Sequence, residues 1–494
     1  MIDFFKAKNQ EDTASLNGIY LHSSYNPTKE AERFAENLTI NSYEKTIILI
    51  EPALSYCASF IKKKYPEITL GAIRLSPEFE SFNSAFDFVI DHFNDNNTEL
   101  IEKLTSLLGE EKLFSTAFID WTPSIKAFNT IYLNTIASIK ESLEKAKTLL
   151  ITREYFEKKW FINSFNFYSY LKKPQLLKNT INKNILIIAS GPSLKAALPI
   201  IKENQNKFFI ICLSSAISFC LKNNIKVDLF FSTDGGYWAG EHLKRLQKNA
   251  VIGLTSEAFC PKRLLEENKV LALHYKDSLI NQFLPDTILD KKLQAVRNGT
   301  VSGTALLFAL NISNKNIYLA GLDMANTKGF QHSQPNEIEY NNELKDFRIS
   351  TREERSYKSE LSEGSLKIYL NWFQNQHFTE NRCFRIIENS KNNLNSIKDL
   401  SILQFEEECK KIQLAADTSE QINYFQDINF SLDEIKIKDS QLIIEKLNNI
   451  DFLHQLYPLT MLSLSHNPDN IELKKHLEDE KRKLITKIQE INNA

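Results

Sequence analysis

The chain alternates between short apolar runs and stretches in which apolar residues recur at helical spacing. A mostly apolar run of four to six residues predicts a buried strand, and spacings of three and four predict a helix. Strands are expected at residues 46–50, 70–75, 185–189, 208–213, 227–232, 251–254, 270–274 and 317–320, and helices at 28–37, 53–64, 194–203, 216–223 and 305–310. This alternation predicts an α/β fold with a mostly parallel, doubly wound sheet.

Four parts of the chain are expected from these patterns: a small α/β N-terminal domain (1–122), a helical connector (123–180), a central Rossmann-like domain (181–400) and a helical C-terminal region (401–494). Thr122-Pro123 is a typical helix start, and apolar residues at helical spacing follow it as far as Leu150. Residues 367–373 and 384–387 are expected to return to the edge of the central sheet.

A smaller pattern lies near the C-terminal end of the chain. Leu477, Leu484, Ile488 and Ile491 form a near-heptad stripe, which predicts a terminal helix that either associates with a second copy or a protein partner, or packs within the chain.

In the N-terminal domain, Glu51-Pro52 follows the first strand, where a nucleotide-binding domain carries a glycine-rich turn. A nucleotide site is therefore not expected in that half.

The candidate chemistry lies in the central domain, at corners where a strand ends. The strand at 185–189 is followed by Ser190, Gly191, Pro192 and Ser193, and then by a helix. A glycine lets the backbone approach a ligand, and the first turn of a helix offers unpaired N–H groups at the positive end of its dipole. This first corner is therefore predicted to hold an anion.

A second corner of similar composition lies more than a hundred residues further along the chain. It places Gly299, Thr300, Ser302, Gly303 and Thr304 at the start of a helix. The strand that follows this helix ends at Gly321-Leu322-Asp323. Two phosphate-friendly corners and one acidic strand end predict a nucleotide site at the carboxyl edge of the sheet.

Other strand ends bring polar groups to the same edge: Ser214 and Ser215 after one strand, and Thr233, Asp234 and Gly235 after the next. Asp234 is a candidate general base, because partial burial against Tyr237 and Trp238 would raise its pKa. His332 is the alternative, since imidazole changes charge near neutral pH.

The blocks around both corners resemble a known family. Ala189-Ser-Gly-Pro-Ser-Leu-Lys195, Gly303-Thr-Ala305, Asn316-Ile-Tyr-Leu-Ala-Gly-Leu-Asp323 and Gly329-Phe-Gln-His332 look like the central domain of the motility-associated factor (Maf) flagellin glycosyltransferases. The same blocks are similar to those of bacterial sialyltransferases that use CMP-sialic acid. The resemblance covers about residues 184–333.

The resemblance implies a GT-A-like, sialyltransferase-type central domain. It implies a glycosyltransferase that moves a nonulosonic acid (pseudaminic, legionaminic or sialic-type) from its CMP-sugar onto Ser or Thr of flagellin. The CMP-activated sugar is then the donor substrate, flagellin is the acceptor, and neither a tightly bound cofactor nor a metal is expected. Donor contacts are expected from both corners, from the hydroxyls at the neighbouring strand ends, and from Asp323 and Met324.

Some positions of the family have a counterpart here and others do not. In the sialyltransferases the base is a histidine from a lid after the Gly-x-Asp strand, a role that His332 would take. The aromatic phosphate contacts that follow their Gly-x-Asp are replaced by Met324-Ala325-Asn326, and Arg297 is the nearest basic residue to the position of their arginine.

The composition limits the partners that the protein can have. Lys plus Arg (60) and Asp plus Glu (62) leave a formal net charge of -2, so no overall field attracts nucleic acid or an anionic membrane. The six cysteines include no pair at metal-binding spacing, and the first residues lack the features of a secretory signal. No apolar run is long enough to span a bilayer. A cytoplasmic, metal-independent enzyme is expected.

Two other functions are compatible with the residues. Archaeal pterin diphosphokinases have a core that resembles the same domain, and they would need ATP and magnesium. A protein that keeps the fold and binds flagellin without catalysis is the non-enzymatic alternative. Residues 326–361 are polar, and they either order as a lid over the bound donor or form a solvated connection.

Overall fold

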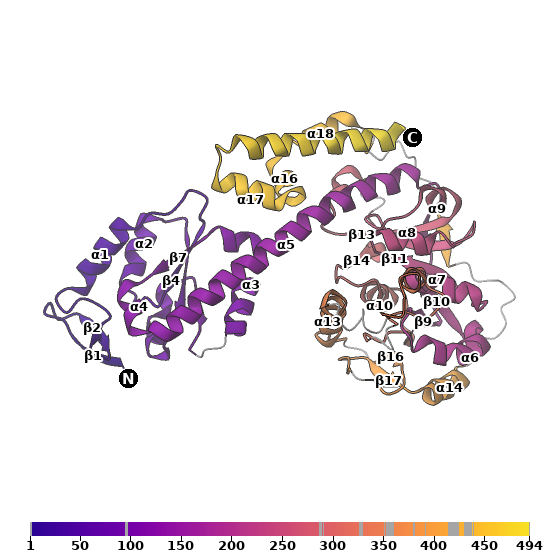
Figure 1. Ribbon diagram of the computed structural model, residues 1–494, viewed down its shortest axis with the longest axis horizontal. Coiled ribbons are helices and arrows are strands. Elements are labelled where there is room, and N and C mark those ends of the chain that lie inside the picture. The colour runs from indigo at the N-terminus through magenta and orange to yellow at the C-terminus, as the bar shows by residue number, and fades with distance from the viewer. Residues whose placement is uncertain are drawn as a thin grey trace. The chain divides into compact units, whose positions relative to one another are not determined.

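The computed structural model describes residues 2–93, 97–285, 289, 291–325, 330–349, 351, 360–378, 381–390, 392–412, 424–428, 437 and 439–493. The chain divides into two compact units, residues 1–157 with 449–480 and residues 158–448 with 481–494. Two of the divisions fall inside long helices, α5 (Asn129–Tyr170) and α18 (Ile471–Asn493) (Figure 1). The units differ from the four parts expected from the sequence, because the end of the chain is shared between them.

The first unit is built on a parallel sheet of four strands in the order β6-β5-β4-β7. These strands are β4 (Thr46–Ile50), β5 (Thr69–Arg74), β6 (Phe88–Asp91) and β7 (Thr116–Asp120). Every residue of β4 is buried, as expected for the central strand of a parallel sheet. A separate antiparallel sheet contains β1 (Ile2–Lys6), β2 (Asp12–Leu16) and β3 (Ile19–Tyr20).

Helices from both ends of the chain complete the first unit. They are α1 (Pro27–Asn37), α2 (Cys57–Lys64), the 3-10 helix η1 (Pro77–Ala85), α3 (Asn97–Phe114), α4 (Thr122–Ala127), α16 (Ile450–Leu456) and α17 (Pro458–His466). Ala31 of α1 and Ile61 of α2 are buried in one core cluster with Ile47 and Leu49 of β4. The helix expected from residue 122 is interrupted, since α4 ends before Phe128 and α5 begins after it.

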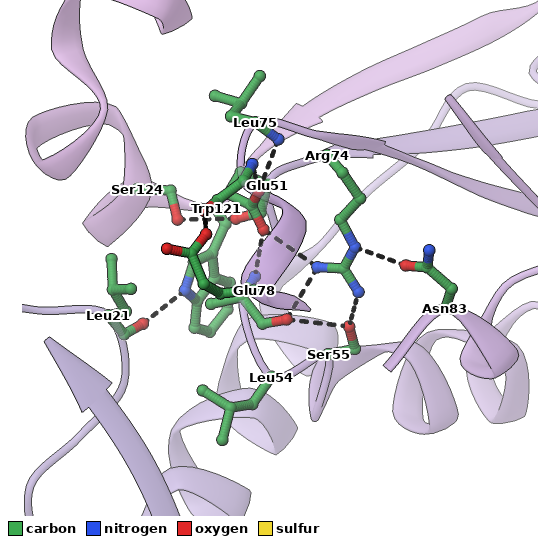
Figure 2. Close-up of polar contacts among 12 residues, drawn as sticks. Leu21, Glu51, Leu54, Ser55, Arg74, Leu75, Glu78, Asn83, Trp121 and Ser124 are labelled. Atoms are coloured by element: carbon green, nitrogen blue, oxygen red, sulfur yellow. Dashed lines mark hydrogen bonds and ion pairs between the residues drawn. The ribbon is translucent and has the colours of Figure 1, made fainter. Parts of the chain in front are cut away.

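The turn after β4 holds a buried ion pair, which Figure 2 shows with its neighbours. Glu51 and Arg74 are both fully buried, and Arg74 Nη1 lies 3.0 Å from Glu51 Oε1. Glu51 Oε2 accepts hydrogen bonds from the N–H groups of Leu75 (2.6 Å) and Ser76 (3.2 Å), and Arg74 Nη2 donates to Ser55 Oγ (2.7 Å). An internal charge pair therefore lies in the corner where a nucleotide-binding domain carries its glycine-rich turn.

The second unit is built on a larger sheet with the order β17-β16-β15-β9-β10-β11-β12-β13-β8-β18, and β14 pairs with β13. Its strands are β8 (Pro174–Leu177), β9 (Asn184–Ile188), β10 (Phe208–Leu213), β11 (Leu229–Ser232), β12 (Val251–Thr255), β13 (Lys269–Tyr275), β14 (Gln294–Ala295), β15 (Ile317–Ala320), β16 (Cys383–Ile386), β17 (Lys398–Leu400) and β18 (Phe425–Asp427). From β9 the chain runs outward through β10 to β13, and it returns to the other side of β9 with β15. These pairs are parallel, so the sheet is doubly wound as expected.

The core of the second unit lies between this sheet and its helices. The helices are α6 (Leu194–Asn204), α7 (Ile217–Lys222), α8 (Tyr237–Leu243), α9 (Lys262–Glu267), α10 (Val301–Ile312), α11 (Glu337–Glu343), α13 (Glu360–Gln374), α14 (Ile402–Lys411) and α15 (Ser440–Lys446). Helix α10 contributes Leu306 and Phe308 to the same buried cluster as Ile185 and Ile187 of β9 and Ile211 of β10. This packing fixes the first turn of α10 near the ends of the strands.

Two expectations for the later part of the chain need correction or completion. Residues 367–373 belong to helix α13 and do not form a strand, whereas residues 383–386 do form β16. The spacing of three between the packed Leu370 and Phe373 suits a helix face. The near-heptad residues of α18 are all buried within the single chain, so the stripe packs internally.

Candidate active site

The candidate residues gather where the parallel strands of the second sheet end. Strands β9, β10, β11 and β15 are mutually parallel neighbours, so the residues that follow each of them lie along one edge. Strand β10 lies on one side of β9 and β15 on the other, so the strand order reverses at β9, and such a switch point is the usual position of a ligand site in a doubly wound sheet.

The first corner (residues 190–193) meets Asp323 at this switch point. Asp323 accepts hydrogen bonds from the Ser193 N–H (3.0 Å) and from Ser193 Oγ (2.8 Å). A Cβ added to Gly191 would lie 2.1 Å from Asp323 Oδ2 and 2.5 Å from the carbonyl oxygen of Gly321. The glycine is therefore required so that Gly321 and the Asp323 carboxylate, which follow β15, can approach.

The N–H groups at the start of α6 are also occupied. Leu194 donates to the carbonyl of Gly191 (3.1 Å), Lys195 to Pro192 (3.4 Å) and Ala196 to Ser193 (3.0 Å). The Ser193 N–H is bound to Asp323, so the N–H groups of residues 193–196 all have partners within the chain. A carboxylate of the chain thus occupies the Ser193 donors that the sequence analysis expects to face an anion.

Asp323 is the acidic centre of the first corner. Burial raises its pKa, although the hydrogen bonds from Ser193 act in the opposite direction. The turn that carries it is set by backbone geometry: Gly321 has φ +74° and its carbonyl accepts from the Gly191 N–H (2.8 Å), and Met324 also has positive φ, 52°. A carboxylate of this kind is suited to accept hydrogen bonds from hydroxyl groups of a ligand.

Serine residues connect the first corner to β10 and to the segment after β15. The Oγ atoms of Ser190 and Ser215 lie 2.7 Å apart. Ser333 donates from its N–H to the carbonyl of Ser190 (2.5 Å) and from its Oγ to the carbonyl of Gly191 (2.8 Å). Ser214 is buried directly after β10. The structure therefore places the expected serines around one corner, and it adds Ser333 to them.

His332 lies beside this corner because its neighbour Ser333 is bound to it. The His332 side chain is 19% exposed, and its Nδ1 lies 3.2 Å from Oε1 of Glu339, which is 1% exposed. Glu339 was not singled out from the sequence. It belongs to the residues 326–361 that were expected to be a lid or a solvated connection, of which 326–329, 350 and 352–359 lie outside the described residues.

Helix α11 attaches this segment to the neighbouring strand ends. Asn336 caps the helix by accepting from the N–H groups of Ile338 and Glu339, and it donates to the carbonyl of Ser215 (2.8 Å). Glu337 lies 2.5 Å from Ser218 Oγ and 2.6 Å from His242 Nδ1. Asn336 followed three residues later by Glu339 is a helix-start signal that could have been found in the sequence. Residues 331–337 are thus docked onto the sheet edge.

The second corner (residues 298–304) differs from the first because its helix start is free. The N–H groups of Val301, Ser302 and Gly303 make no hydrogen bond to any other residue that the structure describes. The cap residue Thr300 does not cap with its side chain, since its Oγ1 lies 2.7 Å from Ser302 Oγ. Free N–H groups, two hydroxyls and the positive end of the α10 dipole make this corner suited to a phosphate.

Arg297 holds the second corner through neighbouring side chains that the sequence does not single out. Arg297 Nη1 and Nη2 each lie 2.7 Å from a different carboxylate oxygen of Glu257, which is 3% exposed. The Arg297 guanidinium also lies 4.2 Å from the ring centre of Tyr275 and 5.0 Å from that of Trp160. Arg297 therefore anchors the corner, and its charge is already balanced by carboxylates.

Close packing shapes the second corner from within and from α13. Asn298 donates from Nδ2 to Thr304 Oγ1 (3.0 Å) and accepts the Thr300 N–H at Oδ1 (3.0 Å). A Cβ added to Gly303 would lie 2.7 Å from the ring of Trp372 in α13, so only a glycine fits against this ring. Gly299 has φ +76°, a backbone conformation that favours glycine.

Asp234 follows β11 but lacks the environment expected for it. It is exposed, and Tyr237 is 63% exposed, so the partial burial expected for this carboxylate is absent. Its Oδ1 accepts the Gly236 N–H at 2.7 Å. Burial raises the pKa of Tyr369, and the negative charge of Asp234 adds to this effect. Asp234 therefore lies near Tyr369, whose ring borders Gly299.

Among the residues that the structure describes, no group of three or more His, Cys, Asp or Glu residues could hold a metal ion. The six cysteines are buried, and none of them forms a disulfide. None of the described helices combines the length and the apolar character that a membrane span requires.

Comparisons with known proteins agree with this architecture. A family model described as "6-hydroxymethylpterin diphosphokinase MptE-like" matches residues 158–329. An uncharacterized protein from Treponema pallidum (strain Nichols) is 31% identical over 236 residues, which are 47% of this chain and 51% of that protein. The chain thus matches about half the length of this curated relative.

The solved structure of the MAf glycosyltransferase from Magnetospirillum magneticum AMB-1 is similar along the whole chain. The match covers 100% of this chain and 90% of that one, with a TM-score of 0.51 and 11% sequence identity. The protein is therefore similar in fold to this glycosyltransferase.

Proposed function

We propose that the protein is a glycosyltransferase that moves a nonulosonic acid from a CMP-sugar onto Ser or Thr hydroxyls of flagellin. The Maf-type fold supports the class of reaction. The observation that carries the donor assignment is the second corner, where the N–H groups of Val301, Ser302 and Gly303 have no partner among the described residues. One phosphate on a nucleoside matches the size and charge of that turn.

The two corners would take different parts of the donor. The phosphate of CMP would bind at Thr300, Ser302 and the first turn of α10, where donors stabilise the charge that develops on the leaving group. Asp323 would repel a phosphate but would accept hydrogen bonds from sugar or ribose hydroxyls. This division places the phosphate at the second corner alone, whereas the sequence had suggested both corners.

The acceptor hydroxyl must lose a proton as CMP departs. His332 and Asp234 remain the two candidates, and the structure distinguishes their surroundings. His332 is held by Glu339 and lies beside the switch point, whereas Asp234 is exposed and bonded to its own turn. A fixed imidazole next to the site is the better candidate for a general base, and we assign this role to His332.

A magnesium-dependent diphosphokinase is the second candidate, because the MptE-like family model matches residues 158–329. Such a reaction transfers diphosphate from ATP and requires carboxylates that hold magnesium. A protein that binds flagellin without catalysis would bind neither nucleotide. The three functions therefore differ in the nucleotide that they bind and in its need for a metal.

A thermal-shift experiment separates the three functions. The protein is heated with CMP, UDP, GDP or ATP, each with and without magnesium, and Ser302→Ala is compared with Thr180→Ala, which removes an exposed hydroxyl of the same unit. We expect CMP alone to stabilise the wild-type protein and Thr180→Ala, and Ser302→Ala to respond less. Stabilisation by ATP only with magnesium would support the kinase, and no response to any nucleotide would support the binding protein.

A further inference from the structure

The ring of His332 is held by a buried carboxylate to which the sequence reasoning gave no role. Oε1 of Glu339 lies 3.0 Å from the backbone nitrogen atoms of Gln331 and His332 and 3.2 Å from His332 Nδ1. One carboxylate oxygen therefore fixes both the backbone and the ring of the histidine. Helix α11 in turn holds Glu339, through the Asn336 cap and the contacts of Glu337.

The position of the proton follows from these contacts. The pKa of Glu339 is lowered: burial acts to raise it, but the hydrogen bonds from His332 and from the Gln331 N–H outweigh burial. An ionised carboxylate can only accept, so His332 Nδ1 is the donor in this contact. Nε2 of the neutral ring is then the acceptor atom, and no described residue forms a hydrogen bond with it.

We infer that Glu339 is a positioning residue that keeps His332 in the Nδ1–H tautomer, with Nε2 as the atom that takes the proton of the acceptor hydroxyl. The acceptor oxygen bonds to the anomeric carbon of the sugar, the bond from that carbon to the phosphate oxygen breaks, and CMP leaves with the electron pair. The proton of the hydroxyl moves to Nε2. The role of Nε2 rests on the proposed function, whereas the pairing of Glu339 with His332 does not.

The pairing is tested without any sugar donor. Diethyl pyrocarbonate acylates neutral imidazole, and mass spectrometry of digested protein gives the rate at His332. We expect Glu339→Gln to react at least about threefold more slowly, because a neutral amide stabilises the positive charge that builds up on the ring less than a carboxylate does. Glu343→Gln, at the exposed end of the same helix, should react like the wild type. Equal or faster reaction of Glu339→Gln would overturn the inference.

A double-mutant cycle on CMP release tests whether Glu339 acts through His332. We expect His332→Asn to lower kcat about 100-fold and Glu339→Gln about tenfold, with the donor KM changed by less than about twofold. The double variant should match His332→Asn alone, because the positioning residue then has nothing to position. A further tenfold loss in the double variant would mean that Glu339 supports the fold and would overturn the inference.

The two experiments fail separately. If the acylation rates differ as expected but His332→Asn releases CMP at the wild-type rate, the base assignment of the proposed function is wrong and the pairing stands. If the wild-type protein releases no CMP, the transferase proposal fails, and the acylation rates still decide whether Glu339 activates the ring. Circular dichroism and thermal unfolding of each variant show whether a loss of rate reflects a loss of fold.

Discussion

Replacing Glu51 by Gln would test the buried ion pair between Glu51 and Arg74 in the first unit (Figure 2). The substitution keeps the shape of the side chain and removes its charge. Arg74 would then remain fully buried without its ion-pair partner. An amide nitrogen at the position of Glu51 Oε2 could not accept the hydrogen bonds that the N–H groups of Leu75 and Ser76 donate there.

The expected cost follows from this burial. Removing one partner of a buried ion pair costs about 3–5 kcal/mol, because the other charge is left uncompensated. Lys62 and Asp87 form a matched control in the same unit, with 2.7 Å between Lys62 Nζ and Asp87 Oδ1 and with 39% and 44% of their side chains exposed. Replacing Lys62 by Gln should cost at most about 1 kcal/mol, since exposed pairs contribute little.

Urea denaturation measures the difference. Trp121 is the one tryptophan within residues 1–157, it is 2% exposed, and its Nε1 donates to the carbonyl of Leu21 at 2.8 Å. Fluorescence in a background where the other three tryptophans are replaced by Phe therefore follows the first unit. Glu51→Gln with Arg74→Met should cost less than the sum of the single changes. A loss below about 1 kcal/mol for Glu51→Gln, or additive single losses, would refute the reasoning.

Three further predictions concern the second unit. Ser302→Ala should lower sugar transfer at least about tenfold, measured as CMP release, and a normal rate would remove that residue from the site. Gly191→Ala should lower the free energy of unfolding by about 1–3 kcal/mol in urea, because its Cβ would lie 2.1 Å from Asp323 Oδ2; wild-type stability would contradict the close approach. Burial acts to raise the pKa of Glu337, but its hydrogen bonds outweigh burial and lower the pKa from 4.5 to about 2. The stability that the ionised carboxylate contributes is therefore present above pH 4.5 and is lost as the pH falls toward 2. Between pH 5 and pH 2 this group should cost the wild-type protein about 2–3 kcal/mol of unfolding free energy, and Glu337→Gln should not show that loss. Urea titrations at the two pH values measure the difference, and the same pH dependence in both proteins would contradict the prediction.

The sequence was informative about the site where chemistry and strand order coincide. Gly191, Ser302 and Asp323 could be selected because small or acidic residues follow apolar runs. Parallel strands then bring these positions to one edge, a consequence of topology that the alternation of strands and helices already implies. The structure places all three at that edge, after β9, β14 and β15.

The same reasoning could not tell which groups at the edge are already paired. The turn at Gly191 and the turn at Gly303 have similar composition, yet one binds the carboxylate of Asp323 and the other leaves its N–H groups without partners among the described residues. Glu339 and Glu257 were missed for a related reason. Their roles depend on His332 and Arg297, which are near in space and, for Glu257, distant in the chain.

The sequence by itself determined the doubly wound α/β sheet, because the length and spacing of apolar runs set which segments become strands and helices. It also determined the positions of the small and hydroxylated residues at the strand ends. Only the tertiary structure decided which of these turns leaves backbone N–H groups without partners among the described residues, and how the end of the chain divides between the two units. A buried donor or charge takes whichever partner the packing brings within hydrogen-bonding distance, and that distance is not encoded in the local pattern of residues.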